Sequence, residues 1–206
     1  MDIVLRGATT KFTFCQEEML HFCNKGCIIY RLLLGIMGIV FIVLGGVIMA
    51  NRYLLPVYKT LYERNFSYSE FDQRMEMQKA VYLLQDMGVP VGDYGFRWYL
   101  HGPYSQSLQD DMHYESGREV AALTLSKEYA ESIGRLHDVI HSEKRGSYSV
   151  TNWVECLASL HYLRENLLDF NATEDEVVQE LENRKKHLSN HDTNVAAYRL
   201  VEGLFH

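Results

Sequence analysis

The sequence predicts a mainly helical domain with a small β element of two or three strands, preceded by one hydrophobic, transmembrane-like helix. Within residues 51–206, apolar side chains recur at helical spacing in several separate segments. Apolar and polar side chains alternate from Phe96 to Leu100, which is typical of a strand. The run from Leu32 to Ala50 contains no charged residue. We therefore divide the chain into an irregular extension (1–31), a hydrophobic helix (32–50) and a compact helical domain (51–206).

Two explanations of the hydrophobic run remain open. As a helix, its nineteen residues would reach about 28 Å, close to the thickness of a bilayer's hydrocarbon core. This favours a single-pass membrane anchor, and the few flanking basic residues do not fix its orientation. Alternatively, the true start lies near Met49 and the preceding residues are a translated leader. We expect a cytoplasmic domain, with a membrane anchor only if residues 1–50 are translated.

Five or six helices are expected in residues 51–206. The central one, at about 70–87, carries an apolar stripe, with Ser69 as its N-cap and Gly88 as the left-handed residue that ends it. Later N-caps are expected at Ser105, Ser126, Thr173 and Ser189, and a long helix is expected to reach about Asp169. Thr173 and Glu176 form a predicted capping box that opens a helix running through His187.

The β element is expected to centre on the strand at 96–100. The segment His101 to Ser105, with its Gly-Pro pair, is expected to break this strand. Residues 119–125 have strand composition, so we expect them to pair with the 96–100 strand as a small hairpin.

These segments also carry a family resemblance. MQKAVYLL at 77–84, followed by FRWYLHGPYS at 96–105, resembles the YwgA-like family of uncharacterised prokaryotic proteins. The chain is more distantly similar to the Panacea or SocA-like antitoxin domain. Weaker likeness at 157–163 and 173–177 extends the resemblance to roughly residues 55–204. It implies a helical, antitoxin-like or prophage- or defence-associated adaptor that binds a protein partner such as a toxin.

Composition and motifs argue against several other functions. Residues 51–206 hold 16 basic and 24 acidic residues, and this net charge of −8 disfavours general binding of nucleic acid. A nucleic-acid-binding regulator remains the alternative, with a winged-helix-like unit built from the 126–140 helix and the 119–125 strand. The sequence lacks phosphate-loop, nucleophile-elbow and zinc-hydrolase motifs, so we expect no enzymatic activity, cofactor or metal.

The predicted partner-binding surface lies around the Gly-Pro turn, because aromatic residues beside an exposed turn are suitable interface anchors. Its candidate residues are Arg97, Trp98, Tyr99, His101, Gly102, Pro103 and Tyr104. An acid–base site using His101, Tyr104 and the following aspartates is the less favoured interpretation. The basic run from Arg184 to His187 is interpreted as cations that complement the end of a helix.

Overall fold

The computed structural model describes residues 51–120 and 126–205. The predicted extension (1–31), the predicted hydrophobic helix (32–50) and most of the predicted 119–125 strand lie outside this range. Of the helices in the described residues, none is long and apolar enough to cross a membrane.

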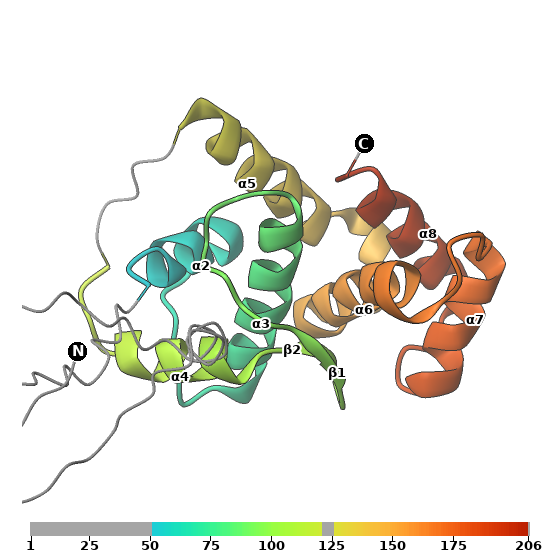
Figure 1. The fold of residues 1–206 in the computed structure, drawn as a ribbon, viewed down its shortest axis with the longest axis horizontal. Coiled ribbons are helices and arrows are strands. Elements are labelled where there is room, and N and C mark those ends of the chain that lie inside the picture. Colours follow the sequence, from blue (N-terminus) through green and yellow to red (C-terminus); the bar gives the residue numbers. More distant parts are fainter. Residues whose placement is uncertain (1–50, 121–125, 206) are drawn as a thin grey trace, which may run out of the picture. The chain divides into compact units, whose positions relative to one another are not determined.

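The described part is mainly helical with one two-stranded sheet, which confirms the predicted fold class for this part of the chain (Figure 1). Its seven α-helices exceed the five or six expected from sequence. In order, the elements are α2 (Leu54–Tyr62), α3 (Phe71–Asp86), β1 (Arg97–Tyr99), β2 (Gly102–Tyr104), α4 (Gln106–Glu115), α5 (Lys127–Ile140), α6 (Val150–Tyr162), α7 (Glu174–Arg184) and α8 (His191–Glu202). A short 3-10 helix (Glu143–Arg145) precedes α6, and a π-helical turn (Leu163–Leu167) follows it.

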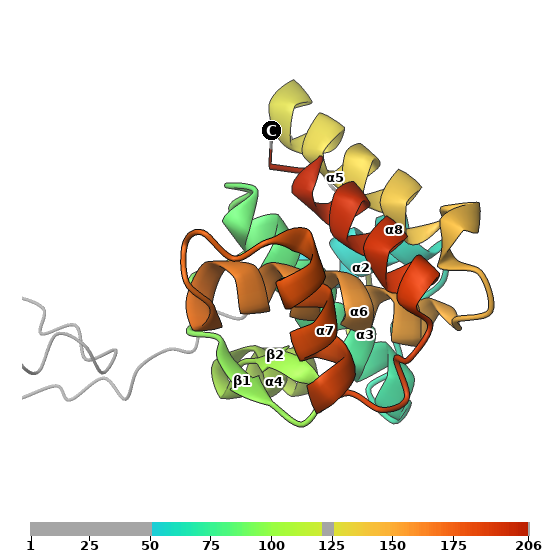
Figure 2. The ribbon, with the colours of Figure 1, turned by 90° about the vertical axis from the view of Figure 1, so that its right-hand side faces the viewer.

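Helix α6 is the centre of the fold. Every side chain from Trp153 to His161 is buried, which is the pattern of a helix surrounded on all sides. It packs against α3, α7 and α8, while α2 packs against α5 (Figures 1 and 2). The core is therefore built around two crossing helices, α3 and α6.

A buried carboxylate ties three of these helices together. Glu76 on α3 is almost fully buried and accepts hydrogen bonds from Tyr58 on α2 (2.6 Å) and Thr151 on α6 (2.8 Å). Arg64, beyond the end of α2, forms an ion pair with the same carboxylate. These partners compensate the cost of removing a charge from water.

The end of α3 follows the prediction closely, whereas its beginning does not. Gly88 has a φ of 79°, its N–H donates to Gln85, and the N–H of Val89 donates to Leu84, which together form a Schellman motif. At the other end the predicted cap is wrong: Glu70 occupies the N-cap position without a side-chain hydrogen bond. Ser69 instead pairs with the hydroxyl of Ser67, 2.8 Å away.

The later helix signals are mostly confirmed. Ser105 and Ser126 accept the expected backbone hydrogen bonds, and Thr173 forms the full capping box. Three boundaries differ from the prediction. The helix expected to reach about Asp169 is α6, which ends at Tyr162 and is followed by a π-helical turn to Leu167. Asn190, rather than Ser189, caps α8, and α7 ends at Arg184 instead of continuing through His187.

The strand pairing observed in the described residues was not predicted, and the expected pairing of 96–100 with 119–125 lies largely outside those residues. β1 pairs in antiparallel fashion with β2, with Trp98 opposite Pro103 and Tyr99 opposite Gly102. The predicted strand break at His101 is thus a tight turn, and the chain resumes as a strand at Gly102. The φ of Gly102, 82°, lies in the left-handed region, which allows the chain to reverse within two residues.

Burial of Leu84 allows a direct test of the core. Leu84 is fully buried in the main hydrophobic cluster, whereas Leu100 is 74% exposed. We expect Leu84→Ala to lower the free energy of unfolding by about 2–5 kcal/mol, because it leaves a cavity. The matched change Leu100→Ala should have an effect within about 0.5 kcal/mol. Urea unfolding measures both, and similar midpoints for the two variants would contradict this packing.

Candidate functional site

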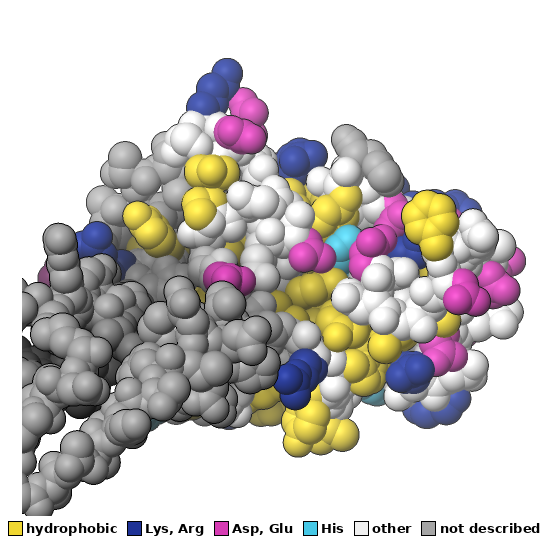
Figure 3. Space-filling model, viewed as in Figure 1, with side chains coloured by type: hydrophobic (Ala, Val, Ile, Leu, Met, Phe, Trp, Pro, Cys, Tyr) yellow, Lys and Arg dark blue, Asp and Glu magenta, His cyan; other side chains and the backbone are white. Residues whose placement is uncertain are grey.

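The tip of the β1–β2 hairpin carries exposed apolar side chains. Tyr99 is 60% exposed and Leu100 is 74% exposed. Phe71, the first residue of α3, is 52% exposed, and its ring centroid lies 5.6 Å from that of His101. We call Phe71, Tyr99 and Leu100 the hairpin-tip surface. In Figure 3, hydrophobic side chains gather along the lower edge of the molecule, where β1 ends.

The predicted partner-binding residues divide into two groups. Arg97 and Tyr99 are exposed, while Trp98, His101 and Tyr104 are half-buried and Gly102 and Pro103 are buried. The rings of Tyr99 and Tyr104 lie 5.6 Å apart across the two strands. Sequence reasoning did not include Phe71 and Leu100 in this surface, although both apolar residues flank segments that it had identified.

Two buried lysines hold the backbone of the hairpin. Lys79, on α3, donates a hydrogen bond to the carbonyl oxygen of Pro103 at 2.7 Å. Lys185, just after α7, donates to the carbonyl oxygen of Leu100 at 2.5 Å. Both residues are only 2% exposed. The ammonium groups therefore fix the two sides of the turn from inside the molecule.

A glutamine extends this support to the end of β2. The side chain of Gln78 accepts a hydrogen bond from the N–H of Ser105 (2.9 Å) and donates one to its carbonyl oxygen (2.8 Å). This two-way pairing imitates a neighbouring strand. The sequence motif QKA at 78–80 thus supplies adjacent side chains, Gln78 and Lys79, that bind the hairpin backbone.

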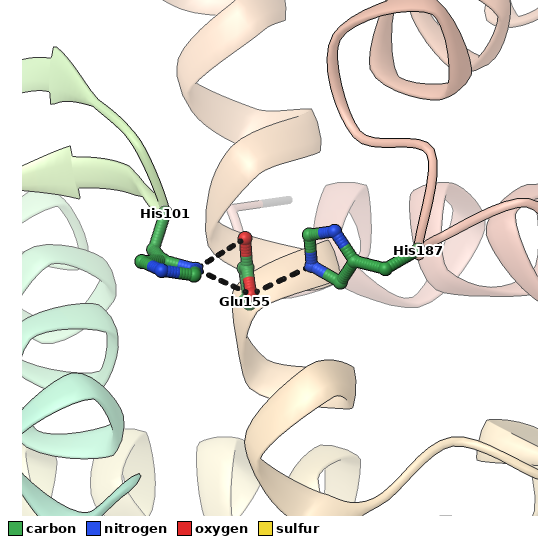
Figure 4. A group of neighbouring side chains, drawn as sticks. All are labelled: His101, Glu155 and His187. Carbon is green, nitrogen blue, oxygen red and sulfur yellow. Dashed lines mark hydrogen bonds and ion pairs between the residues drawn. The ribbon is translucent and has the colours of Figure 1, made fainter. Parts of the chain in front are cut away.

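Glu155, from α6, balances the charge beneath the turn (Figure 4). One of its oxygens lies 2.8 Å from Lys185 Nζ, and the other lies 3.1 Å from His187 Nε2. His101 Nδ1, from the hairpin turn, lies 3.4 Å from the carboxylate. Residues from the hairpin, α6 and the segment after α7 therefore meet at one carboxylate.

Burial and pairing shift the pKa values of this cluster in opposite directions. Burial alone would raise the pKa of Glu155, but Lys185 and His187 outweigh it, so the carboxylate stays charged with a lowered pKa. Burial lowers the pKa of Lys185, and Glu155 only partly opposes this effect. Burial lowers the pKa of Lys79 to about 7.

The sequence analysis missed Lys79, Glu155 and Lys185. The interpretation of the 184–187 basic run as helix-end cations is wrong for Lys185, which is buried and paired with Glu155. A signal was present: Glu155 is the one acidic residue within the apolar α6 sequence VTNWVECLASLHY. A charge in such a helix requires a buried partner, but the sequence does not reveal which lysine provides it.

Two histidines and a carboxylate are also a familiar metal-ligand set. The donor atoms of His101, Glu155 and His187 all lie within 4.8 Å of one another. However, the ammonium of Lys185 already neutralises Glu155, and a divalent ion here would be repelled by it. The geometry is better explained as a structural cluster that fixes the hairpin.

The lowered pKa of Lys79 predicts a specific pH dependence. Between about pH 7 and its ordinary value of 10.5, the unfolded chain keeps the Lys79 proton and the folded protein releases it. The contribution of Lys79 to the free energy of unfolding must therefore rise with pH, by at most about 1.4 kcal/mol per pH unit.

The difference in the free energy of unfolding between the wild type and Lys79→Met, measured by urea unfolding from about pH 6.5 to 8.5, should grow in favour of the wild type. The matched control is Lys127→Met, at an exposed position on α5. Parallel pH curves for the wild type and Lys79→Met would contradict the burial of the Lys79 amino group and its lowered pKa.

The close approach of the hairpin to α6 gives a second test. A Cβ atom at Gly102 would lie 2.3 Å from Ser159 Oγ, so Gly102→Ala combines a clash with a strained φ. We expect a loss on the order of 3 kcal/mol in the free energy of unfolding. Adding Ser159→Ala should restore about half of it, because the next nearest atom is 3.5 Å away. Ser159→Ala alone should be nearly neutral, since its hydroxyl has no hydrogen-bond partner in the described structure. Additive effects of the two changes would contradict the contact.

Comparisons with known proteins identify no relative of this chain. No family model matches it, and no curated protein or solved structure is similar to it. The likeness to the YwgA-like family therefore rests on the sequence motifs quoted above, and the function must be argued from the geometry of the hairpin.

Proposed function

We propose that residues 51–206 form a non-enzymatic interaction domain that binds a cytoplasmic protein partner through the hairpin-tip surface. The observation that carries this proposal is that exposed apolar side chains sit on a backbone fixed from within. Tyr99 and Leu100 project from a turn whose carbonyl groups are held by Lys79 and Lys185. Such a surface needs little ordering when a partner binds, so less free energy is lost on association.

The composition of the surface supports this role. Aromatic side chains and arginine are enriched among residues that dominate protein interfaces. Arg97 and Tyr99 are exposed neighbours on β1, and Phe71 lies beside the turn. This combination offers two aromatic anchors, one aliphatic anchor at Leu100 and one guanidinium within a single short hairpin region.

The buried cluster supports a structural rather than a catalytic role. Its ammonium groups bind backbone carbonyls, and its carboxylate binds Lys185. Lys79 and Lys185 also face the interior, so they add nothing to a surface for nucleic acid. By its resemblance to the YwgA-like and Panacea-like sequences, the domain is proposed to act as an antitoxin-like or defence-associated adaptor.

Co-expression with a toxin-like protein encoded beside this gene, where one exists, and otherwise a pull-down with residues 49–206 as bait, tests the proposal. We expect the two proteins to co-purify and the toxic effect to be suppressed. Tyr99→Ser and Leu100→Ser should each weaken binding by on the order of tenfold or more, because hot-spot residues carry most of the affinity. Their urea midpoints should stay close to that of the wild type, since both side chains are exposed.

Phe170→Ser provides a matched control, because Phe170 is 88% exposed and belongs to the segment before α7 rather than to the hairpin. It should leave binding unchanged. Equal weakening by Phe170→Ser and Leu100→Ser would reject the hairpin tip as the binding surface. Full binding by both hairpin variants would reject it as well.

A further inference from the structure

A second, separate feature is an open cleft of about 620 Å³ formed by the end of α3, the end of α6 and the C-terminal segment. Its principal lining side chains are Tyr82, Asp86, Phe96, Tyr162, Glu165 and Glu202. In Figure 3, acidic side chains gather around hydrophobic atoms on the face between α3 and α8. None of the lining residues belongs to the hairpin-tip surface, so the cleft does not rest on the function proposed above.

The inner wall of the cleft is aromatic. The ring of Tyr82 lies 5.2 Å from that of Phe96 and 5.7 Å from that of Tyr162, measured between centroids. Tyr94 continues the wall, with its centroid 6.4 Å from that of Phe96. The faces of aromatic rings carry partial negative charge and attract cations, including ammonium and guanidinium groups.

The charged side chains of the cleft are acidic. Asp86, Glu165 and Glu202 line it, and no lysine or arginine is among its lining residues in the described structure. The pKa of Tyr82 is raised, first by burial and then by the neighbouring charge of Asp86. The cleft therefore combines an aromatic wall with a negative rim. The carboxylates repel an anion, and they provide no charge attraction for a neutral ligand.

Nδ1 of His161, on a lining residue, is buried and lacks a hydrogen-bond partner among the described residues. The hydroxyl of Tyr82 is also buried, but Asp86 beside it raises its pKa by charge and by hydrogen bonding. Tyr82 and His161 are only 4% and 5% exposed. His161 Nε2 lies 2.9 Å from Asp86 Oδ2, and its ring stacks on Phe205 at 3.9 Å. An unpaired buried polar atom costs free energy, which a hydrogen bond from a ligand would offset.

The backbone that carries two of the cleft's lining residues departs from a regular α-helix. Leu163–Leu167 form a π-helical turn, closed by the N–H of Leu168 donating to the carbonyl oxygen of Leu163 at 2.9 Å. This turn presents Glu165 and Asn166 to the cleft. Single π-helical turns occur often at functional sites, where they redirect side chains that a regular α-helix would place elsewhere.

We propose that this cleft binds an organic cation: an ammonium or guanidinium group on a short apolar stem. The cation lies against the partly exposed rings of Phe96 and Tyr162, with Glu165 and Glu202 supplying the counter-charge. A free amine and the side chain of a lysine or arginine in a peptide share this chemistry. The aromatic wall provides affinity for the stem, and the carboxylates provide selection for positive charge.

Calorimetric titration of the full 206-residue chain tests the proposal. The probes are butylammonium, butylguanidinium and tetramethylammonium, with butanol as the neutral analogue and butyrate as the anionic one. We expect saturable 1:1 binding of at least one cation, at least tenfold tighter than butanol, and no binding of butyrate. Binding should weaken with added salt, because part of the attraction is electrostatic. Absence of saturable binding by every cation, or equal binding of butanol, would overturn the proposal.

Charge-removing variants then locate the site. Glu165→Gln and Glu202→Gln keep the side-chain shape, and each should weaken cation binding by about two- to fivefold. Glu128→Gln changes the net charge equally at an exposed position on α5 and should leave binding unchanged. Equal effects of all three variants would show that only the overall charge matters and would overturn the assignment to this cleft.

A further comparison identifies the source of the cation. N-acetyl-arginine methylamide and N-acetyl-lysine methylamide, which imitate residues within a peptide, are titrated beside the free amines. Tighter binding of a capped amino acid identifies a partner's side chain as the ligand, and tighter binding of the free amines identifies a small molecule. Both results support a cation site, provided that Glu165→Gln weakens the same ligand.

Discussion

The ion pair between Glu155 and Lys185 is the interaction on which the position of the β1–β2 hairpin depends. Both side chains are almost completely buried, with 2.8 Å between the charged atoms. A charge on α6 without a partner would be strongly destabilising, so Lys185 must remain inside. Once there, its remaining N–H groups need acceptors, and the carbonyl oxygen of Leu100 supplies one. The charge on α6 thereby fixes the turn of a hairpin 55 residues earlier in the sequence.

The ion pair between Glu155 and Lys185 positions the hairpin but adds little to the stability of the fold. Buried ion pairs often contribute little net free energy, because desolvation opposes the attraction. Two strands of three residues would not be stable alone in water. Within the described residues, the hairpin is held by side-chain hydrogen bonds from Gln78, Lys79 and Lys185 to its backbone. Its exposed tip is therefore presented in one conformation, as an interaction surface requires.

The parts that the sequence predicted are those determined by local spacing. The N-cap Thr173 and the left-handed Gly88 could be predicted because the atoms that interact there belong to residues close together in the sequence. The pairing of β1 with β2 was not predicted because the Gly-Pro pair signals a break, and only the φ of Gly102 and its close approach to α6 turn that break into a hairpin. The pairing of Glu155 with Lys185 was not predictable, since periodicity does not say which distant lysine enters the core. The aromatic cleft joins α3, α6 and the C-terminal segment and was missed for the same reason.

Strand β1 both packs against the helices and exposes side chains to solvent, and Trp98 is the residue that packs. Its ring lies 5.9 Å from that of Tyr162, and the cations of Arg184 and Lys185 lie 5.4 and 5.2 Å from its centroid. These contacts draw the indole inward, although the sequence placed Trp98 among the partner-binding residues. Since successive side chains of a strand point to opposite faces, an inward Trp98 requires Arg97 and Tyr99 to point outward. The same packing that anchors the hairpin to α6 and α7 thus determines which of its side chains a partner can reach.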